Sequence, residues 1–122
     1  MDTAEFNHLL DTIQASTDAL AALALTGADQ AELVSIIGAA ARNLRASRRL
    51  TDIPASDRAA LHHWRHAVVG QISLFMTAAE LLANDADHPL PEPMRACAQR
   101  IYAAAEQMYA FVETYVAAHD GS

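Results

Sequence analysis

The stretch from Leu61 to Leu82 constrains the fold of this chain more than any other part of the sequence. Apolar residues recur in it at intervals of three and four, and at about 100° per residue they gather on one side of a helix. These apolar positions are Leu61, Trp64, Val68, Ile72, Phe75, Ala79 and Leu82. The pattern predicts a long amphipathic helix.

Three further segments have helical periodicity, which gives four predicted helices at about 3–25, 29–49, 56–83 and 91–118. Asp29 with Glu32 three residues later has the spacing of a capping box, and Ser56 is a second candidate cap. Gly27 is expected to end the first helix, and Pro91 to lie in the first turn of the fourth.

Each of the other predicted helices also has an apolar stripe. In the first helix it comprises Phe6, Leu10, Ile13, Thr17, Leu20 and Ala24, and in the second Leu33, Ile36, Ile37, Ala40 and Leu44. In the fourth it follows a seven-residue rhythm through Met94, Cys97, Ile101, Ala104, Met108, Phe111 and Tyr115. Seven-residue spacing suits near-parallel helix packing, and short connections make successive helices antiparallel. We therefore predict an all-α, antiparallel up-down four-helix bundle forming one domain over residues 1–122.

Composition narrows the classes of function. The chain carries a net charge of −7 and has no lysine, which argues against a nucleic-acid-binding protein. The N-terminus lacks the features of a signal peptide, and no uninterrupted apolar run approaches the ~18 residues that span a bilayer, so a soluble cytoplasmic protein is expected. Cys97 is the only cysteine and is expected to be a small buried hydrophobe.

His66 lies roughly 160° from the centre of the apolar stripe by helical arithmetic, so its imidazole is predicted to face solvent. Gly70 follows one turn later, and Ser73 and Thr77 share the same face. A glycine inside a helix costs about 1 kcal/mol relative to alanine, so its position needs a reason. One reason is that another protein must approach the imidazole closely.

The segment 65–72 with Glu80-Leu81-Leu82 fourteen to sixteen residues after His66 resembles the helix that carries the phospho-accepting histidine in dimerisation-and-phosphotransfer domains of sensor histidine kinases. Arg100–Met108 is similar to the second helix of that family. The acidic residue that follows the histidine in those kinases is Ala67 here, and the chain has no room for an ATP-binding domain. Autophosphorylation is therefore not expected.

The segment from His66 to Gln71 also resembles histidine phosphotransfer (HPt) domains, which are acidic four-helix bundles of about this length. It matches their motif in the histidine, the apolar Val68 and Gly70, and departs from it at Val69, where the family has lysine, and at Gln71, where it has a small hydroxyl residue. The resemblance implies a phosphorelay protein that passes a phosphoryl group between receiver-domain aspartates through His66. It needs no cofactor of its own, because the Mg²⁺ is expected on the partner receiver domain.

The partners implied by the resemblance are a response-regulator receiver domain, a sensor histidine kinase, or both, with no nucleic acid and no membrane. The residues expected to dock them lie around His66 and are His62, Arg65, Val69, Gly70, Ser73, Leu74 and Thr77. His62 is expected to hydrogen-bond to the phosphoryl group, whereas Arg65 lies nearer the core edge and must reach around the helix to help.

Several alternatives remain open at the level of sequence. A degenerate, non-phosphorylated bundle would bind a kinase or response regulator as an inhibitor, scaffold or dimerisation module. His62 and His66 have a spacing that two metal ligands can use, but they face outward and no native metal site is expected. A purely structural bundle is the third alternative. The first two helices either close the core within one chain or form a layer beside a homodimer.

Overall fold

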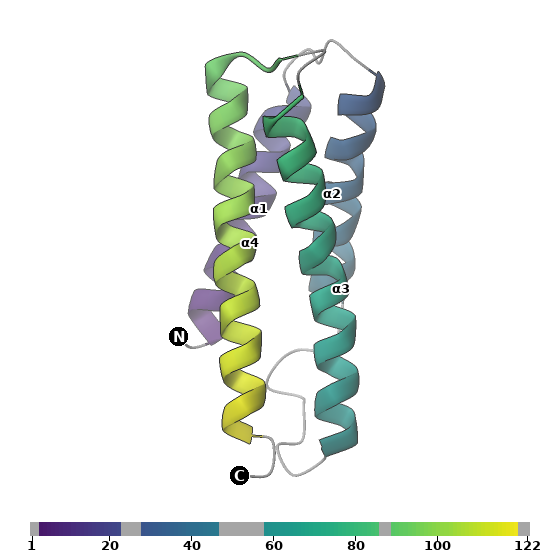
Figure 1. The fold of residues 1–122 in the computed structure, drawn as a ribbon, viewed down its shortest axis with the longest axis vertical. Coiled ribbons are helices and arrows are strands. Elements are labelled where there is room, and N and C mark those ends of the chain that lie inside the picture. Colours follow the sequence, from purple (N-terminus) through teal and green to yellow (C-terminus); the bar gives the residue numbers. More distant parts are fainter. Residues whose placement is uncertain (1–2, 23–27, 47–57, 86–88, 120–122) are drawn as a thin grey trace.

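The computed structural model describes residues 3–22, 28–46, 58–85 and 89–119. Over these ranges it contains four helices and no strand: α1 (Thr3–Ala22), α2 (Ala28–Ala46), α3 (Arg58–Ala83) and α4 (Glu92–His119). Together they form the predicted all-α four-helix bundle, with the helices running alternately up and down (Figure 1).

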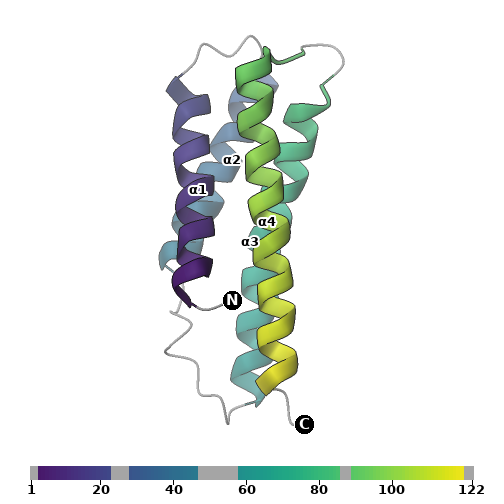
Figure 2. The ribbon, with the colours of Figure 1, turned by 90° about the vertical axis from the view of Figure 1, so that its left-hand side faces the viewer.

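Each helix packs against two neighbours: α1 contacts α2 and α4, and α3 contacts α2 and α4. The last two helices, with 26 and 28 residues, are longer than the first two, with 20 and 19. They extend beyond α1 and α2 at the end where α3 begins and α4 ends (Figures 1 and 2). Because α1 and α2 cover the α3–α4 pair, they close the core within one chain.

The buried apolar residues form one cluster with contributions from all four helices. The predicted stripe of α3 is confirmed in full, since every one of its seven residues is buried. In α1 the predicted positions from Phe6 to Leu20 are also buried, whereas Ala24 lies outside the described residues. Tyr115, Leu33 and Ile36 are only partly buried. Four aromatic rings lie in a row, in which Phe6 contacts Phe111, Phe111 contacts Tyr115, and Tyr115 contacts Trp64.

Two predicted helix starts need correction. Asp29 is not the residue before α2 but lies in its first turn, where a carboxylate interacts favourably with the helix dipole. Pro91 precedes α4, and its carbonyl accepts hydrogen bonds from the backbone N–H groups of Met94 and Arg95 at 3.0 and 2.9 Å. Proline has no N–H to donate but caps the helix through its carbonyl. The predicted cap Ser56, Gly27 and the ends assigned to 23–25, 47–49 and 56–57 lie outside the described residues.

The apolar character of α3 is stronger than the sequence analysis allowed. Arg58–Ala83 contains an 18-residue window with a mean hydropathy of 1.3, so by length and composition alone this helix passes for a membrane span. One third of that window (33%) is buried inside the protein. Phe75, Ile72 and Leu61 point into the bundle, whereas Leu74 and Leu81 are exposed together with His66, Ser73 and Glu80.

Candidate functional site

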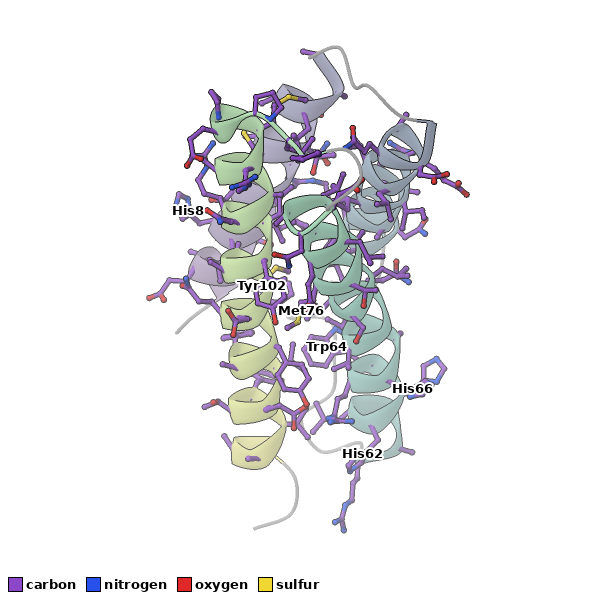
Figure 3. The ribbon with its side chains drawn as sticks, turned by 45° about the horizontal axis from the view of Figure 1, so that its top comes forward. His8, His62, Trp64, His66, Met76 and Tyr102 are labelled. Carbon is purple, nitrogen blue, oxygen red and sulfur yellow. The ribbon has the colours of Figure 1, made fainter. Side chains whose placement is uncertain are left out.

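The exposed face of α3 is the candidate site. His66, Gly70, Ser73 and Thr77 are all exposed, as the helical spacing predicted. In Figure 3 the imidazole of His66 projects away from α3, while Trp64 and Met76 lie between α3 and α4. The ring is therefore accessible to a second protein from the outside of the bundle.

Gly70 leaves open space beside this ring. A Cβ built at Gly70 would meet no atom within 4 Å, other than its chain neighbours and the backbone of its own helix. No tertiary contact described by the structure therefore requires a glycine in the middle of α3. The glycine lowers helix stability by about 1 kcal/mol relative to alanine, and no packing contact described by the structure offsets this loss.

Arg65 is engaged with α4. Its guanidinium pairs with Glu113, with Nη2 at 2.6 Å and Nε at 2.9 Å from the same carboxylate oxygen, Oε1. About a third of each side chain remains exposed, 34% for Arg65 and 39% for Glu113. This contact holds the arginine on the α4 side of α3, so in this arrangement it does not reach around the helix to His66.

The other predicted docking residues divide between the two flanks of the exposed face. Val69 is half-buried against the core, whereas Leu74 is 43% exposed. His62 is exposed one turn before His66. Five of the seven predicted docking residues are therefore exposed, and among them only Leu74 adds a large apolar surface.

Gln71 stands where the HPt motif has a small hydroxyl residue. Its side chain is half-buried, and its Oε1 is fully buried without a hydrogen-bond partner in the structure. By helical spacing it lies about 140° from His66. This residue therefore lies away from the face that carries the candidate phospho-acceptor.

One feature of this region escaped the sequence analysis. Leu81 is 55% exposed and lies on the wall of an open groove of about 790 Å³ between α2 and α3. The groove is lined by Asp29, Glu32, Leu33, Ile36, Thr77, Glu80, Leu81, Asn84 and Asp85. Helical spacing puts Leu81 about 60° from His66, so the sequence alone could have predicted that Leu81 is exposed. The position of the α2 residues beside Leu81 depends on how the two helices pack, and helical spacing within α2 does not predict it.

The described residues include no cluster of three or more His, Cys, Asp or Glu side chains that could hold a metal ion. Cys97 is buried, and the Arg100 guanidinium donates a hydrogen bond to its Sγ at 3.1 Å. The candidate site is the exposed surface around His66.

Comparison with known protein families, with curated proteins and with solved structures finds no match to this chain.

Proposed function

We propose that this protein is a histidine-containing phosphocarrier that passes a phosphoryl group between receiver-domain aspartates through His66, in the cytoplasm. The observation that carries the proposal is the exposed imidazole one turn before a glycine that no internal contact requires. Together they provide a nucleophile and the free space that a docking protein needs to reach it.

The reaction requires little from the carrier beyond presentation. A neutral imidazole nitrogen attacks the phosphorus of an aspartyl phosphate, the N–P bond forms, and the P–O bond to the aspartate breaks. The carboxylate leaves with the electron pair, and the second ring nitrogen keeps its proton. Transfer to the next receiver reverses these steps. The partner's Mg²⁺ and cationic groups stabilise the charge on the transferring phosphoryl group.

The surroundings of His66 suit this role. Gly70, Ser73 and Thr77 follow it along the exposed face with no bulky side chain among them, so a partner backbone can approach α3 closely. Leu74 and Val69 supply apolar surface on the two flanks for docking. No domain that binds ATP is needed, because the phosphoryl group arrives from another protein.

The test is transfer from a panel of phosphorylated receiver domains to the purified protein. We expect a phosphate on His66 that is labile in acid and stable in base, which distinguishes a phosphoramidate from the acyl phosphate of the donor. The variant His66→Gln should accept none. His63→Gln is the matched control, because His63 is also an exposed histidine of α3, and it should accept phosphate at the wild-type rate.

Two results would contradict the carrier function. One is the absence of transfer from every receiver tested, and the other is transfer that survives His66→Gln. Receiver binding that persists in His66→Gln without any phosphate on the wild-type protein would instead favour the non-carrying interaction module.

A further inference from the structure

The groove between α2 and α3 combines apolar walls with a negatively charged rim. Leu81 is 55% exposed, and the half-buried Leu33 and Ile36 face it from α2. Among the nine residues that line the groove, four are carboxylates and none is a lysine or arginine. Leu81 with Leu33 and Ile36 gives this concave surface apolar walls that the apolar side chains of another molecule can contact.

Three of these carboxylates have no ion-pair partner within the described residues: Asp29, Glu32 and Glu80. The fourth, Asp85, accepts a hydrogen bond from Gln30 at 3.4 Å. Unpaired carboxylates around an apolar groove attract a cationic partner and repel an acidic one.

We propose that this groove, which we call the α2–α3 groove, binds a cationic amphipathic helix of a partner protein. Two antiparallel helices form its walls, and a third helix can insert leucine-like side chains between them while its arginines or lysines reach the rim. The proposal does not depend on phosphoryl transfer, and the groove shares only Thr77 with the residues expected to dock a partner around His66.

The charge of the groove disfavours a second copy of this chain as its occupant. In a two-fold symmetric dimer the same patch meets itself, so the carboxylates of one rim would oppose those of the other. The chain as a whole has a net charge of −7 and no lysine, which adds to this repulsion. A basic partner instead gains from the same charges.

The groove lies along α3 from the candidate phospho-acceptor. Leu81 is fifteen residues after His66, which corresponds to about 22 Å along the helix axis. Leu74 lies between them on the α2 side of the exposed face by helical spacing, and it is 43% exposed. A helix in the groove would therefore leave the imidazole itself uncovered, while it would contact Thr77 at the far end of the face that carries His66.

The experiment uses the full chain and two synthetic helical peptides with leucines at positions i, i+3, i+4 and i+7. One peptide carries arginines beside the leucines, and the other carries glutamates at the same positions. Fluorescence anisotropy should show saturable binding of the cationic peptide and none of the acidic peptide. Binding should weaken as salt concentration rises, because exposed charges are screened.

Variants separate the groove from the rest of the surface. Leu81→Ala, which removes apolar surface without changing charge, should weaken binding of the cationic peptide about tenfold. The double variant Glu32→Gln/Glu80→Gln should weaken binding several-fold and make the salt dependence shallower. Tyr109→Ala is the matched control, because Tyr109 is an apolar side chain on α4 that is 40% exposed outside the groove, and it should leave the affinity unchanged. Circular dichroism checks that each variant is folded.

Three results would overturn the proposal: no binding of the cationic peptide, equal binding of both peptides, or an affinity unaffected by Leu81→Ala. The variant His66→Gln should bind the cationic peptide as the wild type does. If peptide binding were lost in His66→Gln, the peptide would occupy the candidate phosphotransfer surface rather than the α2–α3 groove.

Discussion

The two faces of α3 obey different constraints. Phe75 is fully buried and Leu74, its neighbour in sequence, is 43% exposed. On the buried face every large side chain contacts the core, so packing alone explains the residue types. On the exposed face, packing within the chain explains few of the residue types. Those residues are instead candidates for contact with a partner protein.

Gly38 and Gly70 also differ in whether other side chains lie around them. Gly38 in α2 is buried, and a Cβ there would lie 3.5 Å from Arg42 Nη1 and 3.9 Å from Thr17 Cγ2. A Cβ at these distances would make ordinary van der Waals contacts with its neighbours. Gly70 in α3 has open space instead. The two glycines therefore differ in surroundings, because Gly38 lies against neighbouring side chains and Gly70 lies beside open space.

The largest expected effect comes from the buried face. Phe75→Ala removes a fully buried aromatic side chain, and such truncations typically cost about 3–5 kcal/mol because the cavity closes only in part. We expect a decrease of this size in the free energy of unfolding, measured by urea denaturation. Leu74→Ala at the neighbouring position should change it by less than about 1 kcal/mol.

Equal losses for these two variants would break the comparison, since they would mean that Leu74 is covered in the folded protein. One such cover would be a second copy of the chain. Repeating the denaturation at several protein concentrations tests this, because the stability of a dimer depends on protomer concentration.

Gly70 is expected to have an intermediate effect of opposite sign. Gly70→Ala adds a methyl group where no atom lies within 4 Å, so we expect stability to increase by about 1 kcal/mol. Gly70→Arg should also leave the fold intact but block partner approach, and phosphoryl transfer to His66 should fall at least tenfold. A Gly70→Arg variant that accepts phosphate at the wild-type rate would show that the open space is not used for docking.

Most of the fold follows from the sequence because helical periodicity is a local signal. The seven apolar positions of α3 are all buried as predicted, and the spacing from His66 to Thr77 correctly gives an exposed face. Helix starts were less accurate. Asp29, the first residue of the predicted capping box, lies inside a helix that begins one residue earlier, so the motif indicates a start only to within a residue or two.

Contacts between helices could not be predicted in this way. Nothing in the neighbourhood of Arg65 identifies Glu113, 48 residues later, as its partner. Likewise, the α2–α3 groove depends on how Leu33 and Ile36 lie relative to Leu81, which single-helix periodicity does not specify. The residues on each face are thus readable from sequence, whereas the pairs and grooves between helices require the structure. The chemical role of His66 rests on the proposed function and its test.

The smallest expected effect tests whether Arg65 belongs to the fold or to the candidate site. Arg65 and Glu113 are each about a third exposed, and exposed ion pairs contribute about 0.2–1 kcal/mol. A double-mutant cycle with Arg65→Gln and Glu113→Gln should therefore give a coupling energy in this range. Because the pair holds Arg65 on the α4 side of α3, Arg65→Gln and Glu113→Gln should change the rate of phosphoryl transfer to His66 equally and by less than about twofold. A much larger loss in Arg65→Gln than in Glu113→Gln would contradict this expectation. It would mean that the Arg65 guanidinium leaves Glu113 and contacts the phosphoryl group or the partner protein during transfer.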